Sequence, residues 1–133
     1  MYEKFGQFID GKWDHSSDKS TYEVINPANE EVLGYASKAT SKDVDKALQS
    51  AKAGLEIWKK TSPWKRAYII RKIADKIREK QDILAKWMTL EVGKPLAEAK
   101  GEVSGAADIF EWNAEETKRI YGQTVESRFE DTR

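Results

Sequence analysis

Few residues in this sequence have side chains that could carry out a reaction. The one histidine, His15, stands beside Ser16, Ser17 and Asp18. A serine–histidine–aspartate relay works with an oxyanion hole, and nothing around these sequence neighbours builds one. We therefore interpret the segment as a solvated loop. The chain contains no cysteine, which excludes disulfides, thiolate metal ligands and a thiol nucleophile within these residues.

Phosphate-binding patterns are also missing from the sequence. It contains neither a G-x-G-x-x-G pattern nor a P-loop, so no phosphate cradle is predicted. Gly101 and Gly105 have G-x-x-x-G spacing, which in a helix usually leaves room for another backbone to pack closely. We assign no catalytic and no cofactor-binding residue to this chain.

Carboxylates occur in pairs that could share a proton or bind a cation. On a charged helix such pairs more often belong to a solvated face that they share with lysine and arginine. Glu115 and Arg119, for example, have the i,i+4 spacing of a favourable ion pair. We interpret four pairs as solvated: Glu30–Glu31, Glu98–Glu102, Glu111–Glu115 and Glu115–Glu116.

Basic residues interleaved with tryptophan suggest an alternative, a nucleic-acid surface on which bases stack. The 23 acidic side chains balance the 23 basic ones, which favours a solvated helix face with buried tryptophans. We expect no nucleic-acid partner. The residues concerned are Lys59, Lys60, Lys65, Arg66, Arg71 and Lys72, with Trp58 and Trp64.

The sequence gives no sign of a membrane span or a secretory signal. No apolar run approaches the roughly 20 residues that cross a bilayer. The first residues include Glu3, Lys4 and Asp10 and form no continuous apolar stretch. We expect a cytoplasmic protein with no membrane partner. Its 133 residues, 39% hydrophobic and 35% charged, suit one folded domain or part of one.

Residues 1–39 have the pattern of strands and turns. Asp10-Gly11 lies between apolar segments and favours a hairpin, because both central positions of a type I′ turn need positive φ. Two further strands are expected, at Thr21–Ile25 and Glu31–Ala36. Asn26-Pro27 ends the first of these, since proline cannot donate to the ladder.

Residues 40–122 change to a period of about 3.6, which predicts helices. Thr40 and Asp43 form the pattern of a capping box, and Ser62-Pro63 suits the start of a second helix. The apolar stripe expected on the first helix is Val44, Ala47, Leu48, Ala51 and Leu55.

Two more helices are expected before residue 122. Asp82 is expected to cap the third helix, and Gly93 to end it in the left-handed conformation. Pro95 opens the fourth, which we expect to run to Ile120 or Tyr121 before Gly122 stops it.

The expected fold is therefore α+β by content and mainly helical, with a small N-terminal β arm and four helices. We expect all of 1–133 to be the N-terminal part of one domain. Within it we assign 1–39 to the β arm and loops, 40–122 to helices, and 123–133 to a truncated connecting segment.

A series of segments occurs in order over nearly the whole chain: Phe8–Trp13, Val24–Asn29, Asp43–Ala47, Ala51–Ala53 running to Trp58, Lys65–Ala67, Ile73–Asp75, Met88–Val103, Glu111–Trp112 and Ala114–Gly122. Together these segments resemble the opening of an NAD(P)-dependent aldehyde dehydrogenase. The sequence is most similar to the succinate-semialdehyde branch of that family.

This resemblance implies a fragment of the family's α/β cofactor-binding domain. The parent enzyme would oxidise a small aldehyde to a carboxylate with NAD or NADP, through a cysteine thiolate that lies beyond Arg133. The chain alone would be inactive and would bind no cofactor. Its partners would be the remainder of the enzyme or a second copy of itself. The alternative is a non-catalytic helical interaction module.

The resemblance also carries over two sites. In the family the acid at the position of Glu91 can bind a monovalent cation, together with backbone oxygen from the segment containing Ile25. The alternative for Glu91 is a helix-terminal side chain tied to a loop. Gly105 corresponds to a position at the substrate entrance of the family, where a glycine would leave that entrance wide.

Overall fold

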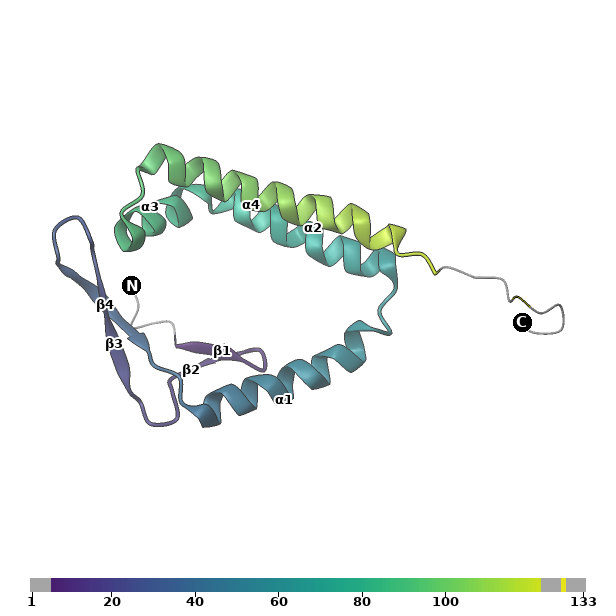
Figure 1. Ribbon diagram of the computed structural model, residues 1–133, viewed down its shortest axis with the longest axis horizontal. Helices are drawn as coiled ribbons and strands as arrows, with labels where there is room; N and C mark the ends of the chain where they lie inside the picture. Colours follow the sequence, from purple (N-terminus) through teal and green to yellow (C-terminus); the bar gives the residue numbers. More distant parts are fainter. Residues whose placement is uncertain (1–5, 123–127, 129–133) are drawn as a thin grey trace.

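The computed structural model describes residues 6–122 and residue 128, so the segment 123–133 lies outside the described residues apart from Arg128. In the described chain two β-hairpins precede four helices, which confirms the predicted fold class (Figure 1). The strands are β1 (Gln7–Ile9), β2 (Lys12–Asp14), β3 (Thr21–Ile25) and β4 (Val32–Ser37). The helices are α1 (Ser41–Trp58), α2 (Pro63–Glu79), α3 (Gln81–Val92) and α4 (Leu96–Glu116), followed by the 3-10 turn η2 (Thr117–Arg119).

The turn predicted at Asp10-Gly11 closes the first hairpin. Asp10 and Gly11 have φ of 54° and 74°, the positive values that the turn requires. Phe8 lies opposite Trp13, with ring centroids 5.1 Å apart. The second hairpin pairs β3 with β4 in antiparallel register. Within the described residues the two hairpins are separate two-stranded sheets.

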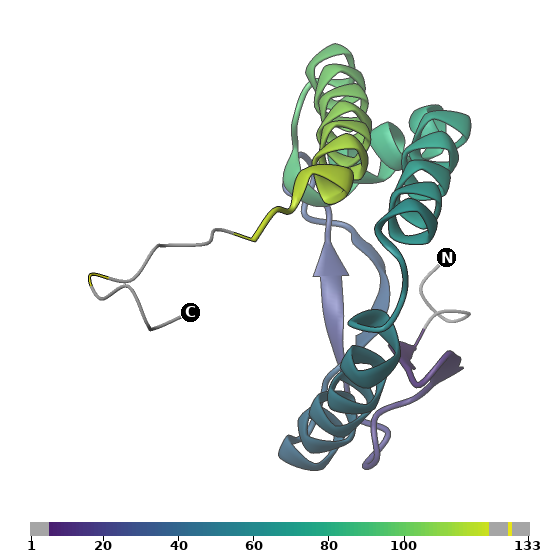
Figure 2. The ribbon, with the colours of Figure 1, turned by 90° about the vertical axis from the view of Figure 1, so that its right-hand side faces the viewer.

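Helices α2, α3 and α4 form the core of the described chain. Helix α4 lies along α2, and α3 packs against α4 (Figures 1 and 2). The residues at these contacts are small, which allows the helix axes to approach closely. Among the described residues no large side chain is fully buried. The buried apolar residues are Ala67, Ala74, Ala85, Ala99, Val103, Ala107 and Ala114.

Helix α1 stands apart from the other three helices. Both ribbon views place it away from α2 and α4, and its main packing contact is with β1 (Figures 1 and 2). The apolar stripe predicted on α1 is present but uncovered in the described structure: Leu48 is 63% exposed and Leu55 56% exposed. The period of the sequence therefore located this helix correctly without showing what covers it.

The chemistry of the helix ends follows the sequence at three places. The Thr40 hydroxyl accepts from the backbone N–H of Asp43, whose carboxylate accepts from the Thr40 N–H, which completes the capping box. Ser62 caps α2 by accepting from the N–H of Lys65. Gly93 ends α3 with φ of 77°, in the left-handed region.

Two predicted helix ends are wrong. Asp82 does not cap α3, because the helix already begins at Gln81; the Asp82 carboxylate instead pairs with Lys100, 2.7 Å away. Helix α4 ends at Glu116 rather than at Ile120 or Tyr121. The chain tightens into η2, and Ile120 is extended, with ψ of 100°.

Asp43 joins the first forty residues to α1 and is only 3% exposed. Its carboxylate accepts from the Ser17 hydroxyl at 2.5 Å and from the Ser17 backbone N–H at 3.1 Å. It also accepts from the Thr40 hydroxyl at 2.8 Å. The Ser17 hydroxyl and then the Thr40 backbone N–H hold the pKa of Asp43 well below its ordinary value. The side chain therefore acts as a charged tie between residues far apart in sequence.

We predict that Gly93→Ala destabilises the protein, because an alanine there must adopt a left-handed conformation. That conformation costs about 1–2 kcal/mol, and the added Cβ would lie 3.0 Å from Cγ of Pro27. Gly54→Ala is the control: Gly54 lies inside α1, where a Cβ meets no atom within 4 Å. This control should stabilise by up to about 1 kcal/mol. Urea unfolding of both variants measures the difference, and equal midpoints would contradict the prediction.

We also predict a pH-dependent loss of stability at Asp43. A carboxyl whose pKa is lower in the folded than in the unfolded state stabilises the fold at pH values above the unfolded pKa, about 3.9. This contribution is lost as the pH falls from there through the folded pKa. The urea midpoint of the wild type should exceed that of Asp43→Asn by a constant amount between about pH 7 and pH 5, and the gap should narrow below about pH 4.

Asp45→Asn is the matched control, because Asp45 is exposed on the same helix. It removes the same charge and should produce no such gap. A gap between wild type and Asp43→Asn that stays unchanged down to about pH 3 would contradict the role of the charged carboxylate.

Candidate functional site

The structure does not assemble a relay around His15. The Ser16 hydroxyl donates to the carbonyl oxygen of Ser20 at 2.9 Å, and the Ser17 hydroxyl donates to Asp43. Asp18 accepts from the hydroxyl of Ser20 at 2.6 Å. His15 itself is exposed. These side chains stabilise a turn. The solvated loop inferred from the sequence agrees with the exposed His15, Ser17 and Asp18 but not with Ser16, which is only 3% exposed.

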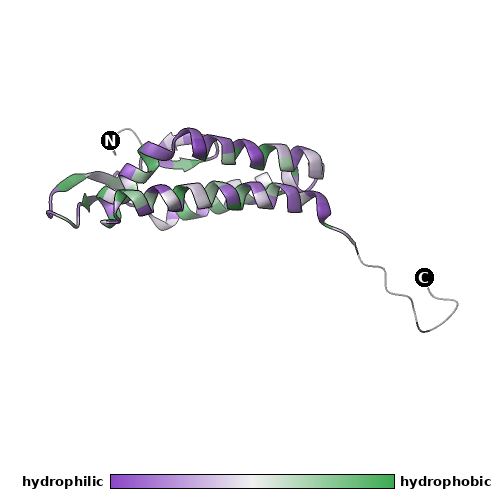
Figure 3. Ribbon diagram, turned by 90° about the horizontal axis from the view of Figure 1, so that it is seen from above, coloured by the Kyte–Doolittle hydropathy of each residue, from purple (hydrophilic) through white to green (hydrophobic). Residues whose placement is uncertain are grey.

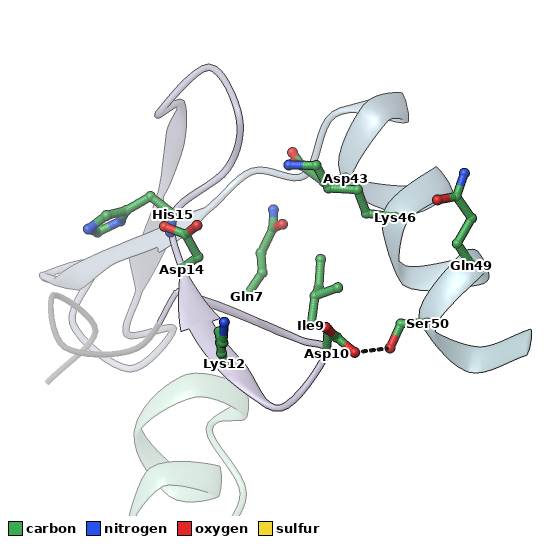
Figure 4. A pocket seen from close by; sticks show the side chains of 10 residues that line it. All are labelled: Gln7, Ile9, Asp10, Lys12, Asp14, His15, Asp43, Lys46, Gln49 and Ser50. Atoms are coloured by element: carbon green, nitrogen blue, oxygen red, sulfur yellow. Dashed lines mark hydrogen bonds between the residues drawn. The ribbon is translucent and has the colours of Figure 1, made fainter. Parts of the chain in front are cut away.

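An open pocket of about 390 Å³, lined mostly by residues with polar side chains, lies between the first hairpin and α1. Gln7 and Ile9 line it from β1, and Lys46 and Gln49 from α1 (Figure 4). The Ser50 hydroxyl donates to the Asp10 carboxylate across it at 3.4 Å. Among the described residues no three histidine, cysteine or acidic side chains gather in an arrangement that could hold a metal ion. Figure 4 shows the His15 ring turned away from Asp43.

The acidic pairs on α4 lie on a charged surface, as the sequence indicated. Arg78 on α2 donates to Asp108 at 2.8 Å and to Glu111 at 2.6 Å, and these bonds raise the pKa of Arg78. Glu115 pairs with Arg71 and Lys118. The specific pair predicted between Glu115 and Arg119 is wrong, because Arg119 pairs with Glu116 at 2.6 Å. Such exposed pairs contribute little stability individually.

The tryptophans near the basic cluster are less buried than expected. Trp64 is 74% exposed, and the ammonium of Lys118 lies 5.0 Å from the centre of its ring. Trp58 is 36% exposed. The expectation of buried tryptophans beneath this face is therefore wrong within the described structure. Lys118 lies in η2 and Trp64 in α2, so only the tertiary fold brings them together.

The structure brings the two segments named for a cation close together. Glu91 lies in the last turn of α3, and Ile25 is the last residue of β3. A Cβ placed on Gly93 would lie 3.0 Å from Cγ of Pro27, so the end of α3 touches the turn that follows β3. The C-terminal end of a helix carries unpaired carbonyl oxygens and a partial negative charge, both of which attract cations.

Gly105 lies on α4 and is half-buried, but the space in its Cβ direction is open. A Cβ on Gly105 or on Gly101 would meet no atom within 4 Å. The interpretation that these glycines admit a closely packed backbone therefore has no support in the described structure. Ile109 and Trp112 continue the same helix face and are 64% and 70% exposed. The opposite face carries the buried residues Ala99, Val103, Ala107 and Ala114.

Comparison with known proteins identifies the family. The sequence profile of the aldehyde dehydrogenase family matches residues 13–133. The chain belongs to the aldehyde dehydrogenase family. A glutarate-semialdehyde dehydrogenase of Pseudomonas aeruginosa is 40% identical over 126 residues, which are 95% of this chain and 26% of that protein. An NADP+ succinate-semialdehyde dehydrogenase of Escherichia coli is 43% identical over 125 residues, covering 94% and 26%.

Solved structures of aldehyde dehydrogenases share this arrangement of elements. A point mutant of betaine aldehyde dehydrogenase from Staphylococcus aureus, in complex with NAD+, has a TM-score of 0.90 at 33% identity, over 95% of this chain and 26% of that one. An NADP-dependent enzyme of Escherichia coli has a TM-score of 0.91 at 42% identity, over 97% and 27%. The chain thus spans about a quarter of the length of the relatives it matches.

Large apolar side chains are exposed along several helices of this aldehyde dehydrogenase segment. Figure 3 shows hydrophobic and hydrophilic residues alternating along the helices. Trp112 is 70% exposed and Ile57 72% exposed, and no described helix is long and apolar enough to cross a membrane. Contiguous exposed apolar patches usually mark contact surfaces. The exposed residues include Val44, Leu48, Leu55 and Ile57 on α1, Trp64 and Tyr68 on α2, and Ile109 and Trp112 on α4.

Sequence reasoning missed two features of the site. The helix spacing from Gly105 could have identified Ile109 and Trp112, because residues four and seven positions later share its face. The bond between Asp43 and Ser17 joins residues 26 positions apart. No local pattern in the sequence predicts that bond.

Proposed function

We propose that these residues are the N-terminal part of an enzyme that oxidises a small aldehyde to a carboxylate with NAD+ or NADP+, with succinate semialdehyde as the expected substrate. The observation that carries this proposal is the family match over residues 13–133. Relatives named as succinate- or glutarate-semialdehyde dehydrogenases, 37–43% identical, support the substrate class. The expected location is the cytoplasm, with no nucleic-acid or membrane partner.

In this proposal the segment is a scaffold that does no chemistry alone. The 133 residues contain no cysteine, so the thiolate of the family reaction has to come from another part of the polypeptide. Its exposed apolar faces would be covered by that remainder or by a second copy of the chain. The alternative, a non-catalytic helical interaction module, predicts that no dehydrogenase activity accompanies these residues.

A direct assay tests the proposed activity. The intact protein that carries these residues should form NADH or NADPH when it is given succinate semialdehyde and the matching cofactor. The 133-residue chain alone should form none and should bind neither cofactor. Absorbance of the reduced nicotinamide measures the first, and calorimetric titration the second. Failure of the intact protein to oxidise any of a set of short aldehydes would favour the interaction module.

We further propose that Glu91 and the backbone carbonyl oxygen of Ile25 contribute to a monovalent-cation site. Carboxylate and carbonyl oxygens are the donors that hard cations prefer. The contact between Gly93 and Pro27 and the negative end of α3 support the proposal. The donor set is one carboxylate with main-chain oxygens, which suits a single positive charge.

We also propose that Gly105 lies at the substrate entrance, and predict that Gly105→Phe narrows it. The open space around its Cβ direction means that the new ring would displace no described residue. In the intact enzyme the KM for succinate semialdehyde should rise roughly tenfold, with a smaller change in kcat. The KM for acetaldehyde should change much less, and Gly105→Ala should lie between. Equal changes for both aldehydes would contradict a role in substrate entry.

A further inference from the structure

We propose that Asp43 is a positioning residue for the cation site: through Ser17 it holds the β3–β4 hairpin in the place where the turn after Ile25 touches the end of α3. This inference rests on the cation site proposed above at Glu91 and Ile25. It assigns to Asp43 an effect on a site at the opposite end of the hairpin. The basis is the way in which the hairpin is attached to the helices.

The β3–β4 hairpin is attached mainly at its two ends. Among the described residues its strands contact each other extensively, and no helix makes a comparably extensive contact with them. At one end the Ser17 segment is bound to Asp43 at the start of α1. At the other end the turn after Ile25 touches Gly93. Figure 1 shows the hairpin extending between these two places, beside the helices. Its position therefore depends on both attachments.

Hydrogen bonds make the segment between Asp43 and β3 stiff. The Lys19 N–H donates to the carbonyl oxygen of Ser16 at 2.9 Å, and the Ser16 hydroxyl donates to that of Ser20 at 2.9 Å. Ser16 is only 3% exposed. The Ser20 carbonyl oxygen in turn accepts from the N–H of Lys38 at 2.9 Å, which ties the start of β3 to the end of β4. A displacement of Ser17 is therefore passed on to both strands.

The far end of the hairpin is equally constrained. The Asn26 N–H donates to the carbonyl oxygen of Glu31 at 2.9 Å, and the Asn26 carbonyl accepts from the N–H of Glu30 at 2.8 Å. The Asn26 side chain accepts from the N–H of Ala28 at 3.0 Å. These bonds close the turn that carries Pro27 against Gly93. We therefore expect the hairpin to move as one rigid unit, attached to Asp43 of α1 near one end and carrying Ile25 at the other.

The buried carboxylate suits this role because each acceptor oxygen already has donors. Asparagine in its place replaces one of the two accepting oxygens by an NH2 donor and removes the charge. The remaining oxygen can still accept from the N–H groups of Ser17 and Thr40, but the NH2 cannot accept from the Ser17 hydroxyl. Asp43→Asn should therefore weaken the tie to Ser17 while keeping the size of the side chain. Ser17→Ala removes the hydroxyl that donates at 2.5 Å, and Ser17→Thr retains one. These three variants separate loss of the tie from loss of bulk.

The experiment measures potassium dependence in the intact protein. Thermal unfolding is followed against KCl, with choline chloride at equal ionic strength as the reference, and the readout is the KCl concentration at half of the potassium-specific rise in Tm. Asp43→Asn and Ser17→Ala should raise that concentration by up to roughly tenfold, the smallest effect typical of losing a group bonded directly to a metal ligand. Ser17→Thr should restore it, and Asp45→Asn, a matched charge change on the same helix, should leave it unchanged.

The outcomes separate this inference from the cation site itself. Glu91→Gln should abolish the potassium-specific rise in Tm. If the rise persists in that variant, the proposed cation site is wrong, and so is the proposed role of Asp43. If Glu91→Gln abolishes the rise but Asp43→Asn and Ser17→Ala only lower Tm equally in both salts, the cation site stands. Asp43 would then be a structural residue without a positioning role, which overturns the inference.

Discussion

The helices of this chain contact one another through small residues and leave their large ones uncovered. Alanine at the contacts between α2, α3 and α4 allows close approach of the axes, but each buried methyl contributes little hydrophobic free energy, about 0.8 kcal/mol per carbon. Side chains that would contribute more, such as Trp64 and Trp112, are exposed in the described structure. Contacts between small residues therefore hold the described helices together, while the large apolar side chains contribute little to that core.

The position of α1 shows the same constraint. Its stripe has the spacing of a core-facing helix, yet Val44, Leu48 and Leu55 contact no other described helix to an appreciable extent. The high TM-scores to solved aldehyde dehydrogenases show that this separation is shared with much longer chains. An amphipathic helix that does not pack against the helices next to it in sequence is typical of a fold in which its apolar face packs against a more distant element.

Polar contacts complement this sparse apolar core. The β3–β4 hairpin is attached by a buried carboxylate at Asp43 and by the contact of Pro27 with Gly93, neither of which buries much apolar surface. A buried charge stabilises a structure only when hydrogen bonds satisfy it, and Asp43 accepts from both Ser17 and Thr40. The ion pairs between α2 and α4 lie at the surface, so they align the helices more than they stabilise them.

Local chemistry in the sequence determined where most elements begin and end. Thr40, Ser62, Gly93 and the Asp10-Gly11 pair each act on their own backbone within a few residues, so their effect is visible without a fold. The failures arose where a neighbour competes. Asp82 pairs with Lys100 instead of capping α3, and Arg119 pairs with Glu116 instead of Glu115. Spacing predicted charged surfaces correctly but not the individual partners.

The sequence by itself determined the family, the order of the elements and the absence of a thiol nucleophile from these residues, because each is a property of residue types and their spacing. Only the tertiary structure decided which residues meet across the chain. It placed Ser17 on Asp43, Pro27 on Gly93 and Lys118 over Trp64. It also showed that Gly101 and Gly105 face open space. Such contacts depend on how distant segments are arranged, and periodicity along one helix contains no information about what lies opposite its faces.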